Sequence, residues 1–235
     1  MLIAANFKTN KTRIQTANYY EAVSNFITEK SITVDAMIFP PATALASFDG
    51  AMTVGAQNAY AVENGAFTGE IGLEQLNEFS IKTILIGHSE RRHILGESQE
   101  VMVQKFNYFK ALGFSIVYCI GEPLEVREEG SEALMSYLDD QLEGIDLDYE
   151  NLIIAYEPVW AIGTGLTPST DEVELIHTAL RQKIKAPILY GGSVKVNNAK
   201  ELLSLNNVDG ALIGSGALQA EDYCSILAIA QALDK

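Results

Sequence analysis

Short apolar runs recur along the chain and alternate with longer segments of helical periodicity. Residues 152–156 (Leu-Ile-Ile-Ala-Tyr) are apolar at every position, which is typical of a strand covered on both faces. The segments between the runs predict amphipathic helices, because apolar side chains return every three or four positions, as at Met102, Phe106 and Phe109. We predict eight strands, at Leu2–Phe7, Val34–Phe39, Thr53–Gln57, Thr83–His88, Ser115–Ile120, Leu152–Glu157, Pro187–Tyr190 and Val208–Ile213.

Eight strand-and-helix units in 235 residues predict an α/β fold in which a closed, eight-stranded parallel sheet forms a (β/α)8 barrel. An open doubly wound sheet usually has fewer strands and leaves its edges unpaired. No Pro-rich or Ser-rich linker divides the sequence, and no repeat of fixed period is visible. We therefore expect residues 1–235 to form a single barrel domain.

Composition restricts the setting in which the protein works. The formal charge of -15 makes nucleic acid and anionic membranes poor partners, so any phosphate site must be built locally. There is no run of eighteen apolar residues and no secretory pattern at the N-terminus, which predicts a cytoplasmic protein without a membrane span. Cys119 and Cys224 are too few for a disulfide framework, and we expect reduced thiols.

The acidic excess is concentrated in one segment. Between Glu122 and Glu150, eleven acidic residues accompany a single base, Arg127. We interpret this run as a solvated outer face of a helix, because charge runs of this kind are usually exposed.

Chemically active residues stand where the predicted strands end. Asn6 and Lys8 close the first strand, His88 the fourth and Glu157 the sixth, and glycine pairs follow the seventh and eighth. The carboxyl ends of parallel barrel strands share one rim, where barrel enzymes carry out their chemistry. Residues far apart in the sequence are therefore expected to meet there.

Glu157 ends an apolar strand and precedes Pro158, which disfavours helical angles at Glu157 and keeps it extended. Gly163 and Gly165 follow, and their conformational freedom predicts a hinged loop, so the segment is typical of a base beneath a lid. A structural alternative stays open, in which a strand ends at a charged residue and a loop leads into the next helix.

Lys8 and His88 each have a structural and a functional interpretation. Lys8 is the only positive side chain that the pattern places at the rim, although an exposed or helix-capping lysine is the common case. His88 precedes Ser89, a candidate helix cap, so the ring would face a helix N-terminus, which disfavours the imidazolium. A neutral imidazole could then donate a hydrogen bond to a substrate oxygen. The alternative is a core histidine whose hydrogen bonds are satisfied.

Two strand-to-helix turns are rich in glycine, at residues 190–194 (Tyr-Gly-Gly-Ser-Val) and 213–216 (Ile-Gly-Ser-Gly). Such turns present backbone N–H groups that bind phosphate without Lys or Arg. Either turn alone could be a plain connection, but two after consecutive strands favour a phosphate site. Other motifs fail on spacing: His88 and His93 do not fit the zinc-binding helix, and Ser193 has no nucleophile elbow.

The chain resembles the triosephosphate isomerase family over nearly its whole length. The matching motifs follow the family's order: residues 5–10 (ANFKTN), 55–58 (GAQN), 65–70 (GAFTGE), 86–92 (IGHSERR), 119–122 (CIGE), 155–165 (AYEPVWAIGTG) and 190–194 (YGGSV). The resemblance implies a TIM barrel that interconverts dihydroxyacetone phosphate and D-glyceraldehyde 3-phosphate through an enediol(ate). It implies neither a metal nor an organic cofactor.

The family's known roles fall on matching positions of this sequence. By resemblance, Glu157 is the base, His88 polarises the carbonyl and moves protons between the two oxygens, and Lys8 stabilises negative charge on the intermediate. The implied substrate-binding residues are Asn6, Lys8, Gly163, Ser193, Gly214 and Ser215.

The loop Gly65–Glu70 has an apolar tip, which is costly in water unless something covers it. The resemblance implies a homodimer in which this loop inserts beside Asn6, Lys8 and Glu90 of the other subunit. A loop folded onto its own barrel is the alternative.

Several positions depart from the family pattern. Phe7 replaces the usual Trp, Thr9 the usual Met, Leu166 a Lys and Ser215 a Gly, and Pro168 follows soon after the second hinge. These changes affect packing, the lid and the phosphate turn, and leave the three catalytic candidates in place.

Two other functions compete with the isomerase. A barrel aldolase would use Lys8 as a Schiff-base nucleophile, which borohydride trapping with a ketose phosphate would reveal. A non-catalytic phosphate-binding barrel is the other, because a fold does not dictate activity. The joint presence of Lys8, His88 and Glu157 argues against it.

Overall fold

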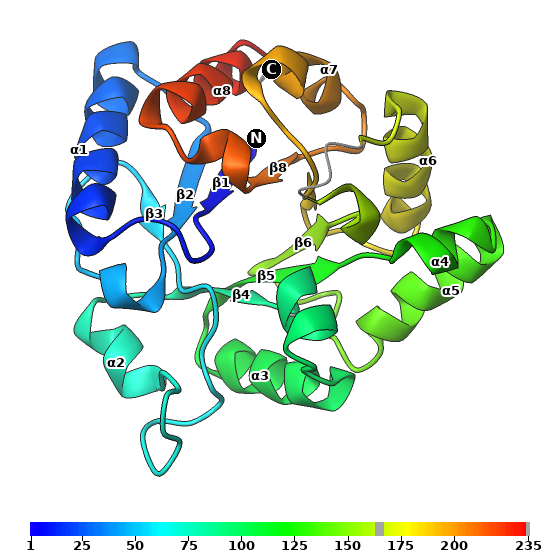
Figure 1. Ribbon diagram of the computed structural model, residues 1–235, viewed down its shortest axis with the longest axis horizontal. Coiled ribbons are helices and arrows are strands. Elements are labelled where there is room, and N and C mark those ends of the chain that lie inside the picture. The colour runs from blue at the N-terminus through cyan, green and yellow to red at the C-terminus, as the bar shows by residue number, and fades with distance from the viewer. Residues whose placement is uncertain (163–166, 234–235) are drawn as a thin grey trace.

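The computed structural model describes residues 1–162 and 167–233. Strands occupy the centre and helices surround them (Figure 1). The strands are β1 (Leu2–Asn6), β2 (Asp35–Phe39), β3 (Thr53–Val54), β4 (Thr83–Ile86), β5 (Ser115–Ile120), β6 (Leu152–Tyr156), β7 (Ile188–Tyr190) and β8 (Gly210–Ile213). The helices are α1 (Arg13–Lys30), α2 (Leu73–Glu78), α3 (Gln99–Ala111), α4 (Leu124–Glu128), α5 (Ser131–Leu142), α6 (Thr170–Arg181), α7 (Val196–Leu203) and α8 (Ala220–Leu233). None of the helices described here is both long enough and apolar enough to cross a membrane.

The strands form one parallel sheet in the order β3-β2-β1-β8-β7-β6-β5-β4. The ends of this order meet just beyond β3, where Ala56 forms a parallel bridge with Ile84 of β4. The Ala56 N–H donates to Thr83 O at 2.9 Å, and Leu85 N–H donates to Ala56 O at 2.9 Å. This bridge joins the two edges, and the predicted (β/α)8 barrel is confirmed.

Two apolar cores lie on opposite sides of the sheet. Along β1, Leu2 and Ala4 belong to a small cluster of inward-facing residues, whereas Ile3 and Ala5 belong to the large cluster between strands and helices. The strands other than the short β3 alternate between the two clusters, because successive side chains point to opposite faces. Burial on both faces explains why the strands are continuous apolar runs.

The strand predictions agree with the structure to within a few residues. The largest difference is β3, predicted to end at Gln57 and observed to end at Val54. The chain leaves β2 there, because Gly55 still donates to Ile38 of β2 while Ala56 already bonds to β4.

The acidic segment is not solvated throughout, and the interpretation is wrong at Glu122. Its side chain is fully buried and accepts hydrogen bonds from Tyr156 Oη at 3.1 Å and Trp160 Nε1 at 2.9 Å. Burial raises the pKa of Glu122, because desolvation disfavours the carboxylate. This carboxyl therefore anchors the segment that follows β6.

Candidate active site

The inward-facing rows of several strands continue past the apolar layers into the rim. In β1 the row Leu2 and Ala4 continues to Asn6, and in β6 the row Ile153 and Ala155 continues to Glu157. Asn6 and Glu157 are both buried. The two-residue period of a strand therefore points these polar side chains into the mouth of the barrel.

His88 reaches the same place by a different route. Leu85 is the inward residue of β4, so an unbroken strand would point residue 87 inward and residue 88 outward. Gly87 has φ 79°, a left-handed angle that glycine adopts without cost, and it turns the chain at the strand end. A Cβ at this position would lie 2.7 Å from Arg92 Nη2 and 2.9 Å from Cys119 O. Gly87 is therefore required both for the turn and for the close contact.

Glycines on both neighbouring strands make room for Glu157. A Cβ built on Gly121, after β5, would lie 1.7 Å from Glu157 O. A Cβ on Gly191, after β7, would lie 2.6 Å from Glu157 Cγ. The backbone is fixed as well, because Glu157 N–H donates to Ile120 O at 2.7 Å and Gly191 N–H donates to Tyr156 O at 2.7 Å. The carboxylate thus sits in a slot that only glycine leaves open.

Lys8 is held in a left-handed conformation with φ 52°, which is unfavourable for a residue with a Cβ. Its N–H donates to Asn6 Oδ1 at 3.0 Å, and its carbonyl accepts from Gln57 Nε2 at 2.8 Å. Gln57 also donates to Phe39 O at 2.9 Å. These bonds tie Lys8 to both β1 and β2, and they offset the local strain at a functional position.

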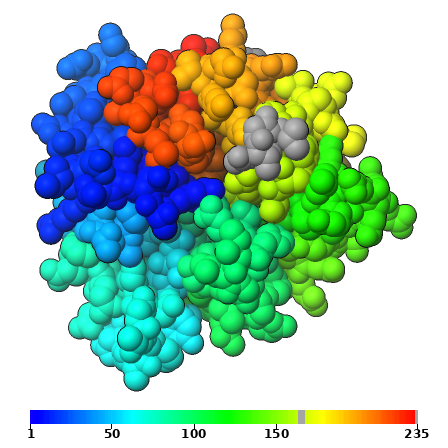
Figure 2. Space-filling model, in the orientation of Figure 1, coloured from blue at the N-terminus to red at the C-terminus, as the bar shows by residue number. Residues whose placement is uncertain are grey.

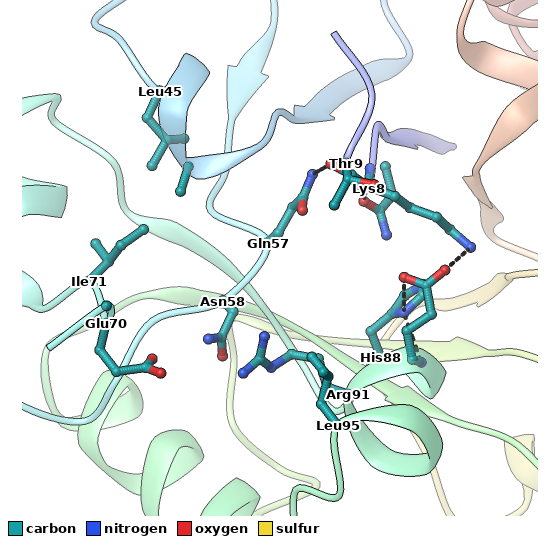
Figure 3. A pocket seen from close by; sticks show the side chains of 14 residues that line it. Lys8, Thr9, Leu45, Gln57, Asn58, Glu70, Ile71, His88, Arg91 and Leu95 are labelled. Carbon is teal, nitrogen blue, oxygen red and sulfur yellow. Dashed lines mark hydrogen bonds and ion pairs between the residues drawn. The ribbon is translucent and has the colours of Figure 1, made fainter. Parts of the chain in front are cut away.

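A chain of polar contacts links the side chains at the rim. Lys8 Nζ lies 2.8 Å from Glu90 Oε1 (Figure 3). His88 Nε2 lies 3.2 Å from Glu157 Oε1, and the N–H of Ser89 donates to Glu157 Oε2 at 3.2 Å. A cation, an imidazole and a carboxylate are therefore within reach of one small molecule.

The hydrogen bonds around His88 favour one tautomer. Its Nδ1 accepts the backbone N–H of Glu90 at 3.3 Å, so this nitrogen carries no proton. The proton of a neutral ring is then on Nε2, which points toward Glu157. Ser89, expected as a helix cap, makes no side-chain capping bond, and the segment after it is a single turn of π-helix, Glu90–Ile94. His88 satisfies the first N–H groups of this turn, because its ring accepts from Glu90 and its carbonyl accepts from Arg91 at 2.8 Å and from Arg92 at 3.2 Å.

The turn after β7 presents unused backbone donors. Within the described residues, the N–H groups of Gly192 and Ser193 donate to no protein acceptor. The turn is held in shape by Ser193 Oγ, which donates to Ala161 O at 3.1 Å, and by Asn198 Nδ2, which donates to Ser193 O at 2.9 Å. Free N–H groups on a fixed backbone suit an anion.

A cavity of about 140 Å³ connects these features. Its lining includes the catalytic candidates Lys8, His88 and Glu157 and the predicted binding residues Asn6, Ser193, Gly214 and Ser215. Gly163, the remaining predicted binding residue, and the hinge positions Gly165 and Leu166 lie outside the described residues. Lys195 also lines the cavity, so the expectation that Lys8 is the only cation at the rim is wrong. Over the ranges that the structure describes, no group of three or more His, Cys, Asp or Glu side chains could hold a metal ion.

A second cavity, of about 290 Å³, opens beside Lys8 and Glu90 (Figure 3). Leu45, Gln57 and Leu95 line it together with residues 69–71, which belong to the loop between β3 and α2. That loop extends beyond the ring of helices (Figure 1). In Figure 2, which has the same orientation and colours, the cyan segment that contains the loop forms a lobe on the surface. This cavity shares Asn6, Lys8 and His88 with the first, so whatever fills it adjoins the candidate active site.

The first residues after Glu157 are anchored from α4 and from the loop that precedes it. Trp160 donates to Glu122, and the Arg127 guanidinium lies 4.3 Å from the centre of the indole. Arg127 also pairs with Glu172, whose carboxylate accepts the N–H of Ser169 at 2.7 Å where α6 begins. One arginine therefore contacts described residues on both sides of the segment 163–166.

The chain is similar in sequence to known proteins over nearly its whole length. The family model described as triosephosphate isomerase matches residues 1–230. A triosephosphate isomerase of Sulfurimonas denitrificans is 57% identical over 235 residues, covering 100% of this chain and 98% of that protein. Those of Sulfurovum sp. and Wolinella succinogenes are each 55% identical, and each match covers 97% of this chain and 99% of the relative.

Proposed function

This chain belongs to the triosephosphate isomerase family, and on that premise we propose that Glu157, His88 and Lys8 interconvert dihydroxyacetone phosphate and D-glyceraldehyde 3-phosphate. The chain is an isomerase, and the proposal concerns which of its residues act and how. In it, a proton leaves the carbon beside the carbonyl, an enediol(ate) forms, and the proton returns to the neighbouring carbon.

Glu157 is the base in this proposal. Both of its oxygens have close polar neighbours, one being His88 Nε2 at 3.2 Å and the other the donating N–H of Ser89 at 3.2 Å. Its side chain is almost fully buried, so a carboxylate freed from these contacts would face the substrate with little competing water. Substrate would replace His88 as the neighbour of Glu157, and the carboxylate would turn from Ser89 toward the carbon acid.

His88 and Lys8 stabilise the oxygens in this proposal. With the proton on Nε2, a neutral His88 can donate to the carbonyl oxygen and then pass protons between the two oxygens of the intermediate. Lys8 carries the positive charge that favours the enediolate, and its constrained backbone fixes the base of that side chain.

The phosphate group would lie at the turns after β7 and β8. The unused N–H groups of Gly192 and Ser193 support this placement, and Gly214 and Ser215, which follow the neighbouring strand β8, line the same cavity. Gly214 has no side chain between its backbone and Lys8, whose Cε would be 3.5 Å from a Cβ built there. A phosphate held here would keep the reacting carbons near Lys8 and Glu157.

The observation that carries the proposal is the convergence of Lys8, His88 and Glu157 on one cavity that ends at unused backbone donors. The test is an assay in which D-glyceraldehyde 3-phosphate is the substrate and the dihydroxyacetone phosphate formed is reduced at the expense of NADH. We expect turnover without added metal or organic cofactor, and no covalent adduct after borohydride treatment with the ketose. Borohydride-dependent labelling of Lys8 would instead favour the aldolase alternative.

We also propose that the enzyme is a homodimer joined through the loop Gly65–Glu70. Phe67 at the loop tip is 42% exposed, although its ring also contacts Tyr60 of the same chain, with ring centres 4.5 Å apart. The 290 Å³ cavity beside Lys8 and Glu90 is a suitable receptor for the partner's loop. Light scattering should return a dimer, and a fully active monomer would contradict the proposal.

We propose a cytoplasmic location as well. The two cysteines, Cys119 and Cys224, are free and buried, and unpaired thiols are typical of proteins in a reducing compartment.

A further inference from the structure

Lys195 is a cation beside the phosphate turn to which the family pattern assigns no role. It follows Ser193 and Val194 directly and immediately precedes α7. Its residue is exposed, yet it lines the same 140 Å³ cavity as Lys8 and Glu157. Lys195 therefore stands at the mouth of the cavity, on the side where the phosphate would bind.

The backbone of Lys195 is not available to an anion. Its φ of -139° and ψ of 167° are extended, and its N–H donates to Asn198 Oδ1 at 2.7 Å. Asn198 binds Ser193 O through its Nδ2, so one side chain fixes both ends of the segment from 193 to 195. Any contribution of Lys195 to anion binding must therefore come from its ammonium group.

Lys195 and Lys8 differ in their acidic neighbours. Lys8 Nζ lies 2.8 Å from Glu90 Oε1, and the Glu157 carboxylate lines the same cavity. Within the part of the chain that the structure describes, Lys195 forms no ion pair with a carboxylate. In a protein of net charge -15, an unpaired cation at a cavity mouth raises the local concentration of anions.

We propose that the ammonium group of Lys195 binds the phosphate end of the substrate and supplies a charged contact in addition to the backbone N–H groups. This inference rests on the proposed function for the identity of the substrate, but its chemistry concerns any phosphate monoester or inorganic phosphate. Because the contact is remote from the reacting carbons, Lys195 acts on binding and not on proton transfer.

The test compares Lys195→Gln with Lys200→Gln, which changes the net charge equally. Lys200 is an exposed residue of α7 and is absent from the lining of the cavity. We expect Lys195→Gln to weaken inorganic phosphate binding by calorimetry, and to raise KM for the triose phosphates, each about two- to fivefold with kcat retained, as is typical of an exposed charge pair. Lys200→Gln should bind and turn over as the parent does, and Lys195→Arg should retain the affinity.

Salt dependence sharpens the result. The difference in phosphate affinity between the parent and Lys195→Gln should shrink as ionic strength rises, because exposed charges are screened over about 8 Å at physiological salt. Equal phosphate affinities for Lys195→Gln and Lys200→Gln at low salt would overturn the inference, whatever the turnover. Absence of isomerase activity in the parent would instead refute the proposed function, and the calorimetric comparison would still decide the role of Lys195.

Discussion

The two sides of the active-site cavity are built on different principles. On the side of β1, β4 and β6, the chemistry depends on the ends of three long side chains, Lys8, His88 and Glu157, each fixed by polar contacts. On the side of β7 and β8, the turns around Gly192 and Ser215 present mainly backbone to the cavity, and the charged side chain of Lys195 stands at its mouth. The first side depends on the chemistry of its side chains, and the second depends mainly on backbone that small residues leave accessible, with Lys195 as the exception.

This difference predicts how each side responds to substitution. A change on the first side removes or moves a reacting group, so its effect should appear in kcat. Apart from the charge of Lys195, a change on the second side matters only when it alters the backbone or fills space, so many substitutions there should be mild. Gly191 connects the two sides, because it belongs to the turn after β7 and also leaves room for Glu157.

The largest effect is expected from Lys8→Met, which removes the cation of the first side while keeping an apolar stem. Loss of one stabilising donor usually costs about a hundredfold to a thousandfold in kcat, and Glu90 would also lose its partner. We expect a loss of that size, together with weaker binding of phosphoglycolate by calorimetry. Lys200→Met, on the exposed side of α7, is the matched control. Unchanged inhibitor affinity in Lys8→Met would show that the cation has no electrostatic role in the site.

Glu157→Asp keeps a carboxylate but withdraws it by one methylene. Because proton abstraction depends steeply on geometry, we expect kcat to fall on the order of a hundredfold while the thermal midpoint stays close to that of the parent. Gly121 and Gly191 leave the slot open for the shorter side chain, which supports retention of the fold. The same change at the exposed Glu201 should have no effect on kcat. A parent-like rate for Glu157→Asp would exclude this residue as the base.

Gly191→Ala tests the connection between the two sides. The added Cβ would lie 2.6 Å from Glu157 Cγ and 3.2 Å from Tyr156 O, so the base must move. We expect kcat to fall about tenfold, because small misplacements of a catalytic group are costly, while inorganic phosphate binds as before. Calorimetry with phosphate and the isomerase assay, run on the same preparation, separate the two effects. Equal losses in both would mean that the substitution damages the phosphate turn itself.

Much of the fold could be predicted from the sequence, because each strand is a local apolar run. The exception, β3, ends early because Ala56 pairs with β4, and that pairing depends on where the barrel closes. Burial of Glu122 was hidden for a similar reason. The sequence shows it at the start of an acidic run, whereas its partners Tyr156 and Trp160 come from the next unit of the barrel.

The catalytic candidates could be predicted because parallel strands bring their ends to one rim. The space around Glu157 could not, because it depends on register between neighbouring strands: Cys119 pairs with Ala155, and Tyr156 with Tyr190. Only this register places Gly121 and Gly191 against the same residue. The route of His88 into the cavity was also hidden, since it requires a positive φ at Gly87.

Ser215→Gly should have the smallest effect and defines the second side most clearly. The hydroxyl is lost, but the N–H group remains, and the residue already stands at the start of a short helical turn, Ser215–Ala217. We expect kcat, KM and phosphate affinity to change by less than about twofold, because exposed polar substitutions away from special features usually change the free energy by less than about 0.5 kcal/mol.

The contrasting variant is Ser215→Pro, which removes the N–H while keeping a backbone angle suited to the first position of a helical turn. If the backbone binds the phosphate, Ser215→Pro should weaken inorganic phosphate about tenfold, the size typical of a lost hydrogen bond to a charged group, with a thermal melt to confirm folding. A folded Ser215→Pro protein with parental affinity, beside a weakened Ser215→Gly, would mean that the hydroxyl and not the backbone contacts the phosphate. The division between a side made of side chains and a side made of backbone would then fail at β8.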